Sequence, residues 1–239
     1  MSLFHKKHPE GGKLIVFVDC VSPYSWFGFT NTVRYRPLLQ AYGVSVEIIP
    51  FFLGAARDGA GNPFTPTPKW KEAFSTQDSN LTGEMLGLEV NRPKDFPILS
   101  LFKVNAVQPV RVATYIKDHY PPEKFEQTFP AFSVGYWSKG INISTPDGVV
   151  KALAGIFPED EIKDIMKKAV SPENKQRVIE LTKSAGAFGA PWIQAVNSKG
   201  HRRDWFGNDR WEQVFYHLEV PFTTARVIPP EELEAKSKL

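Results

Sequence analysis

Hydrophobic and polar positions alternate at both ends of the chain and follow a helical period in its middle. The apolar run 14–18 is typical of a buried strand. Ser22 and Pro23 follow it, as an N-cap and a first helical residue do, and the predicted helix bends or ends near Pro37. The alternating segment 44–50 predicts a second strand. This unit is therefore strand–helix–strand, which favours a parallel pair of strands.

The middle of the chain carries the helical pattern. Glycine and proline make segment 57–68 a loop, and helical periodicity then extends over 69–185. The last helix of this block has Ser171 before it as a cap and Gly186 after it as a stop. The helices that the pattern defines best are expected over 107–119, 161–169 and 172–185.

Strand character returns near the carboxyl end. Segments 192–196 and 202–206, joined by a turn, predict a hairpin, and Asn208 is expected to cap a final helix. Two strands and one helix cannot form a core alone, so this unit should rejoin the first one. The fold predicted is α/β, with the helical block as an insertion.

Composition excludes several classes of protein. The 239 residues are 42% hydrophobic with a net charge of +3, which is typical of a folded chain and too weakly basic to indicate nucleic-acid binding. No stretch approaches 18 uncharged apolar residues, so we expect no membrane span. The single cysteine, Cys20, excludes a Cys-x-x-Cys pair within the chain and is interpreted as a small buried hydrophobe. The histidines lack ligand spacing, so no metal is predicted.

Three loops are expected to meet at one edge of the sheet, where α/β proteins bind ligands. In the first loop, 20–26, Ser22 either caps a helix or donates a hydrogen bond to an anion at the helix N-terminus. The second loop, 186–192, is either an ordinary turn or contains a cis Ala190–Pro191 bond that exposes the Ala190 backbone to a peptide-like ligand. In the third loop, 206–210, Asn208 and Asp209 either cap a helix or hold a charged ligand.

Taken together, these loops resemble a known family. Ser22-Pro23-Tyr24-Ser25-Trp26 after a strand, Ala190-Pro191 before a strand, and Gly207-Asn208-Asp209-Arg210 before the last helix are similar to the motifs of kappa-class glutathione transferases. The related 2-hydroxychromene-2-carboxylate isomerases and the more distant DsbA-like oxidoreductases belong to the same superfamily. The resemblance covers about residues 13–220. Ser22 and Ser25 stand where the oxidoreductases have redox cysteines, so disulfide exchange at this motif is lost.

The resemblance implies a thioredoxin-like domain with an inserted helical domain, in a homodimer that binds glutathione. The thioredoxin-like domain would comprise 13–56 and 186–220, the helical domain 57–185, and a tail 221–239. Ser22 would be the catalytic hydroxyl, donating to the glutathione sulfur. The other residues implied for glutathione are Asn62 near the thiol, Ala190 before Pro191 for the cysteinyl backbone, and Asn208 and Asp209 for the γ-glutamyl end. Tyr24, Trp26 and Phe64 are expected to line the substrate pocket, although the tryptophans also suit the core.

The expected reaction begins with the thiolate of glutathione. A free thiol with a pKa near 8.5 is mostly protonated at pH 7, and lowering the pKa by about 2 units requires about 2.7 kcal/mol. A helix N-terminus and the Ser22 hydroxyl can supply that stabilisation. The thiolate would attack an apolar electrophile or reduce an organic peroxide. The alternatives are a glutathione-dependent isomerase, which consumes no glutathione, and a thioredoxin-like module that binds a partner without catalysis.

The final three residues, Ser237, Lys238 and Leu239, match the signal read by the peroxisomal import receptor. The acidic, proline-rich segment 229–232 before them favours an accessible tail. We therefore expect a peroxisomal location.

Overall fold

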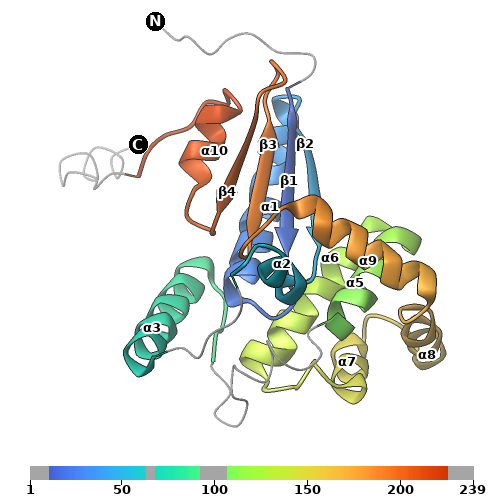
Figure 1. Cartoon of the computed structure of the whole chain (residues 1–239). Helices are drawn as coiled ribbons and strands as arrows, with labels where there is room; N and C mark the ends of the chain where they lie inside the picture. Colours follow the sequence, from blue (N-terminus) through green and yellow to red (C-terminus); the bar gives the residue numbers. More distant parts are fainter. Residues whose placement is uncertain (1–10, 63–67, 92–106, 226–239) are drawn as a thin grey trace, which may run out of the picture.

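A four-stranded mixed sheet forms the centre of the computed structural model, which describes residues 11–62, 68–91 and 107–225 (Figure 1). The strands are β1 (Lys13–Val18), β2 (Ser45–Pro50), β3 (Trp192–Val196) and β4 (Arg202–Phe206), in the order β2-β1-β3-β4. β1 pairs parallel with β2 and antiparallel with β3, and β3 pairs antiparallel with β4. The predicted parallel pair and hairpin are both confirmed.

Alternation along β1 directs its side chains to two different cores, because successive residues of a strand face opposite sides of the sheet. Leu14 and Val16 belong to the main core, together with residues of α1 (Pro23–Ala41) and α10 (Trp211–His217). Phe17 belongs to a second cluster, which includes residues of α2 (Leu53–Gly59) and α9 (Pro172–Ala185). Helices therefore cover both faces of the sheet.

A helical block lies between β2 and β3 in the sequence. Besides α2 and α9, its described elements are α3 (Lys69–Leu86), α5 (Val107–His119), α6 (Pro122–Ser133), the π-helical turn η1 (Val134–Ser138), α7 (Pro146–Leu153) and α8 (Glu159–Lys168). The α/β fold with a helical insertion is thus confirmed. The main core continues from the sheet into this block without a break. The division into domains at 56/57 and 185/186 therefore stays a prediction.

Two local predictions were wrong, and one was left with a single alternative. α1 does not end at Pro37 but continues to Ala41, so of the two alternatives at this proline only a bend remains a prediction. The loop expected from residue 57 begins later, since α2 extends to Gly59. The last helix has Arg210, not Asn208, at its N-cap position, and the Asn208 side chain accepts a hydrogen bond from Asn31 instead (3.1 Å).

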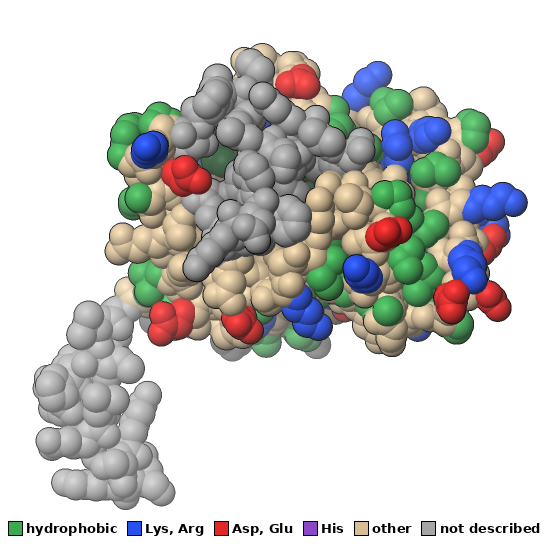
Figure 2. Space-filling view, turned by 90° about the horizontal axis from the view of Figure 1, so that it is seen from below, with side chains coloured by type: hydrophobic (Ala, Val, Ile, Leu, Met, Phe, Trp, Pro, Cys, Tyr) green, Lys and Arg blue, Asp and Glu red, His purple; other side chains and the backbone are tan. Residues whose placement is uncertain are grey.

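The surface seen in Figure 2 intermingles Lys and Arg side chains with Asp and Glu side chains, in keeping with the small net charge. In the part of the chain that the structure describes, no helix has both the length and the apolar character needed to cross a bilayer.

Candidate functional site

Ser22 occupies the N-cap of α1, at the carboxyl end of β1, which is the lower end of the sheet in Figure 1. Its carbonyl accepts from the N–H groups of Ser25 (3.1 Å) and Trp26 (3.3 Å). Its hydroxyl oxygen accepts a longer bond from the Ser25 N–H, at 3.4 Å. An accepting hydroxyl oxygen still carries its own O–H donor. Both interpretations of Ser22, as a cap and as a donor to an anion, are therefore compatible with this geometry.

Asp19 is a buried carboxylate beside this loop, and sequence reasoning missed it. Its side chain accepts from the N–H of Val21 (2.9 Å) and of Leu53 (3.1 Å), and its own N–H donates to the Ser25 hydroxyl (3.0 Å). Asp19 thereby joins the end of β1 to the starts of α1 and α2. The signal that could have revealed it is a single charged residue directly after an apolar run.

Burial raises the pKa of Asp19 from 3.8 to about 6, because desolvation of the carboxylate outweighs the hydrogen bonds from the backbone of Val21, Leu53 and Ser22. The folded chain therefore binds this proton more tightly than the unfolded chain does. The protonated Asp19 therefore stabilises the folded chain. This contribution to the free energy of unfolding is fully present below about pH 4 and is lost as the pH rises through 6.

We predict that the ionised Asp19 carboxylate destabilises the chain at neutral pH. Compared with the Asp19→Asn variant, the wild-type chain should therefore be less stable at neutral pH than in mild acid. The difference in unfolding free energy, wild type minus variant, should fall by about 2 kcal/mol between pH 4 and pH 7. Urea unfolding of both chains at several pH values measures it. A difference that stays constant over this range would mean that Asp19 has an ordinary pKa.

The second loop contains the Ala190–Pro191 bond, which is cis. The N–H of Gly207 donates to the Pro191 carbonyl (3.1 Å), so the second and third loops are joined. Among the described residues, none forms a hydrogen bond with the backbone N–H or carbonyl of Ala190. These two groups suit an extended, peptide-like ligand, as the sequence predicted.

A cavity of about 340 Å³ lies where these loops meet. Its volume is at the lower end of the range typical of ligand pockets. Four of the predicted residues line it: Tyr24, Ala190, Asn208 and Asp209. Asp209 is exposed and paired with Arg210 at 3.4 Å. The carboxylate of Asp209 gives this wall negative charge, which suits an ammonium group.

Helix α3 closes one side of this cavity through Asp78 and Thr82, which sequence reasoning did not identify. The Tyr24 hydroxyl donates to the Asp78 carboxylate at 2.6 Å, which links α1 to α3. No local pattern marks these two residues, because only the position of α3 relative to the sheet brings them to the cavity.

The remaining predicted residues lie elsewhere. Asn62 is tied to the second loop, since its side-chain N–H donates to the Phe188 carbonyl (2.9 Å). Trp26 is 3% exposed in the main core and lines neither this cavity nor the larger one described below. Phe64 lies outside the described residues. Cys20 is buried, and its desolvation raises the thiol pKa well above the usual value, so this thiol is a poor nucleophile at neutral pH.

No cluster of three or more His, Cys, Asp or Glu side chains suited to a metal ion occurs within 11–62, 68–91 and 107–225. The polar groups described above are hydrogen-bond donors and acceptors and three carboxyl groups, those of Asp78 and Asp209 at the cavity and that of the buried Asp19 beside the N-terminus of α1. Such an arrangement can bind a zwitterionic, peptide-like molecule and stabilise negative charge beside Ser22.

Comparison with known proteins gives a consistent result. The sequence model of the DSBA-like thioredoxin domain family matches residues 13–219. The human protein named glutathione S-transferase kappa 1 is 28% identical over 209 residues, which is 85% of this chain and 89% of the human one. The glutathione S-transferase kappa 2 of Caenorhabditis elegans is 28% identical over 216 residues, covering 86% of this chain and 91% of the nematode protein.

A solved structure titled 2-hydroxychromene-2-carboxylate isomerase matches the fold with a TM-score of 0.59. It is 19% identical, and the match covers 85% of this chain and 93% of that one. At this identity the likeness concerns the fold.

Proposed function

The chain belongs to the DSBA-like thioredoxin domain family, and on that premise we propose that it is a glutathione transferase of the kappa class. The single observation behind the proposal is the position of Ser22 at the N-cap of α1, the helix whose second residue, Tyr24, lines the cavity where the second and third loops contact each other. Its curated relatives named kappa-class transferases support the same assignment. The full sequence holds one cysteine, so a Cys-x-x-Cys exchange reaction has no residues to perform it.

In this proposal glutathione is the co-substrate and binds along the joined loops. The Ala190 backbone pairs with the cysteinyl residue, and Asn208 and Asp209 hold the γ-glutamyl end. The sulfur then lies beside Ser22, at the positive end of the 19-residue helix α1. The Ser22 hydroxyl donates to the sulfur and favours the thiolate, which is the nucleophile. Ser22 itself does not need to ionise.

The proposed reaction is attack of this thiolate on an apolar electrophile, with reduction of an organic peroxide as the related activity. The aromatic ring of Tyr24, which lines the cavity, supports the choice of an apolar electrophile.

We predict that the purified chain binds glutathione by calorimetry and conjugates it to a chlorodinitrobenzene-type acceptor. One glutathione should disappear for each product formed. Turnover of an isomerisable substrate without loss of glutathione would instead support the isomerase alternative. If millimolar glutathione gave no heat of binding, the proposal would be overturned. The remaining interpretation would be a thioredoxin-like module that binds a partner without catalysis.

We propose a homodimer in which α3 supplies the contact. Four large side chains of α3 are exposed: Trp70 (74%), Phe74 (65%), Leu81 (56%) and Met85 (78%). At 100° per residue they lie within about 60° of one another around the helix. α3 lies at the left of Figures 1 and 2. An apolar stripe on one helix can pack against the same stripe of a second copy across a twofold axis.

We predict that the double substitution Trp70→Glu with Met85→Glu converts a dimer into a monomer, because four like charges would meet in a desolvated contact. Light scattering after size exclusion measures the mass. Leu38→Glu is the matched control, since Leu38 is 62% exposed on α1 and lies outside the stripe. A wild-type chain that is monomeric at micromolar concentration, or a double variant that stays dimeric, would contradict this contact.

We also propose import into peroxisomes through Ser237, Lys238 and Leu239. These residues lie outside the described ranges, so the proposal depends on the sequence signal alone.

A further inference from the structure

A second and larger cavity, of about 680 Å³, lies between α2, α5 and α9. None of its described lining residues lines the smaller cavity beside Ala190. The described residues that line the smaller cavity come from α1, α3 and the second and third loops, and none of them comes from α2, α5 or α9. The proposed function therefore leaves this cavity unused.

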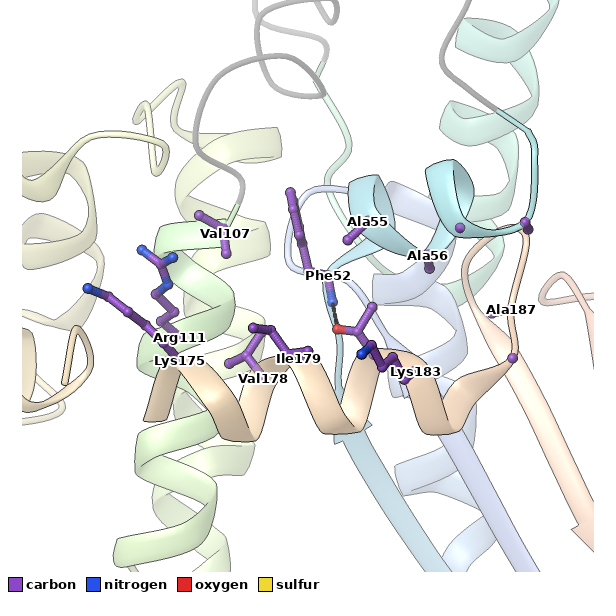
Figure 3. A pocket seen from close by; sticks show the side chains of 14 residues that line it. Phe52, Ala55, Ala56, Val107, Arg111, Lys175, Val178, Ile179, Lys183 and Ala187 are labelled. Atoms are coloured by element: carbon purple, nitrogen blue, oxygen red, sulfur yellow. Dashed lines mark hydrogen bonds between the residues drawn. The ribbon is translucent and has the colours of Figure 1, made fainter. Parts of the chain in front are cut away.

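The floor and one wall of this cavity are apolar. Val178 and Ile179 of α9 form the floor in Figure 3, and Phe52 and Ala55 face them from the start of α2. Residues 175, 178, 179, 182 and 183 recur at helical spacing, so one face of α9 lines the cavity along its length. From Lys175 to Lys183 this face is about 12 Å long. An extended aliphatic chain suits such a surface.

Three cations border the cavity, and no carboxylate is present among its described lining residues. In the view of Figure 3 the side chains of Arg111 and Lys175 lie at the same end of the cavity, which both of them line. Neither forms an ion pair with any residue in the described ranges, and the buried Nε of Arg111 has no hydrogen-bond partner there. Like charges that line one cavity repel each other, and a bound anion would relieve that repulsion.

This cationic end is held in place by buried polar contacts. Asn174 is 6% exposed, and its side-chain N–H groups donate to the carbonyl oxygens of Arg111 (2.9 Å) and Ala169 (2.7 Å). These bonds fix the backbone of α5 against the first turn of α9, beside Lys175. On the other side, the Phe52 N–H donates to the Thr182 hydroxyl (3.1 Å), which fixes the start of α2.

We propose that this cavity binds an aliphatic carboxylate, with the carboxylate between Arg111 and Lys175 and the chain along Val178 and Ile179. Charge complementarity selects the head group, because a guanidinium and an ammonium together favour a carboxylate over a neutral or cationic head. The apolar floor selects the chain. No described residue lines both cavities, so we expect the two ligands to bind without competing for the same side chains.

The test is calorimetric titration of the full chain with dodecanoate below its micelle concentration, compared with dodecanol and dodecylamine. We expect saturable binding of one dodecanoate per chain, and at least tenfold weaker binding of the other two. Dodecanoate affinity should fall as salt rises, because charge pairing contributes to it. Saturating glutathione should leave the affinity unchanged.

Two variants address the two halves of the site. Lys175→Glu reverses one charge at an exposed position and should weaken dodecanoate binding at least tenfold. Ala55→Trp should block the cavity from an exposed position on α2 without disturbing the core. Lys167→Glu, the same charge change on α8, is the matched control and should retain wild-type affinity. Thermal unfolding of each variant checks that it is folded.

No saturable binding of dodecanoate, equal binding of dodecanol, or unchanged affinity in Lys175→Glu would overturn the proposal. A change of mass in Lys175→Glu without dodecanoate binding would assign this face to a second copy of the chain. Failure here leaves glutathione binding untouched, and loss of glutathione binding leaves this titration unaffected, so the two proposals fail separately.

Discussion

Replacing Ser22 by alanine is expected to lower kcat/KM for glutathione conjugation at pH 7 by about 10- to 100-fold. The reason is that a hydrogen bond to a charged group contributes about 1.5–3 kcal/mol, and the sulfur would lose that bond in its ionised form. The pKa of the bound thiol should rise accordingly. Thiolate absorbance in the ultraviolet, followed against pH, measures that pKa directly, and steady-state rates measure the consequence.

The control for this experiment is Ser22→Thr, which keeps a hydroxyl at the N-cap and should retain most of the activity. Alanine also removes the cap, at a cost of about 0.5–2 kcal/mol of stability, so rates are compared well below the unfolding temperature. The difference in kcat/KM between Ser22→Ala and wild type should become smaller above pH 9, where the thiol of bound glutathione is ionised in both proteins. Equal rates at pH 7 would remove Ser22 from the proposed mechanism.

Replacing Gly28 by valine is expected to disrupt the proposed site from within α1. A Cβ at residue 28 would lie 2.9 Å from Cγ and 3.0 Å from Cβ of Pro191, which is closer than such atoms approach. Either α1 or the second loop must move, at a cost of about 1–3 kcal/mol. The displacement would separate Ala190 from the N-terminus of α1. Glutathione affinity should therefore fall at least tenfold, together with the unfolding temperature.

Gly59→Val is the matched control, because no atom lies within 4 Å of a Cβ built at Gly59. In a helix, valine is slightly more favourable than glycine, so this control should be as stable as wild type. Calorimetry with glutathione and thermal unfolding are applied to both variants. Together they distinguish the effect of the steric clash with Pro191 from the effect of replacing a helical glycine by valine. A Gly28→Val chain with wild-type affinity would show that contact between α1 and Pro191 does not position the ligand.

Much of the fold was predictable, because its signals are local. Helix α9 has Ser171 as N-cap and a left-handed Gly186 as C-cap, as the sequence predicted, and the 192–196 and 202–206 strands pair as the hairpin expected from their alternation. In these segments the residues that begin or end each element are adjacent to it in sequence. The same is true of Ser22 and Pro23 at the start of α1.

The predictions failed where partners are distant in sequence. Helix α2 has no side-chain cap of its own, and its first N–H groups are held by Thr182 and Asp19. Asn208 is held by Asn31, 177 residues away, so it does not cap α10. Asp78 reaches the cavity only through the placement of α3. Each of these contacts follows from packing, which no local pattern encodes.

A crystal structure of the chain with glutathione tests the proposed role of Ser22 most directly. We expect the sulfur within hydrogen-bond distance of the Ser22 hydroxyl and the cysteinyl backbone paired with Ala190. Density for glutathione elsewhere, or a sulfur that points away from Ser22 while the hydroxyl contacts only the Ser25 N–H, would contradict it.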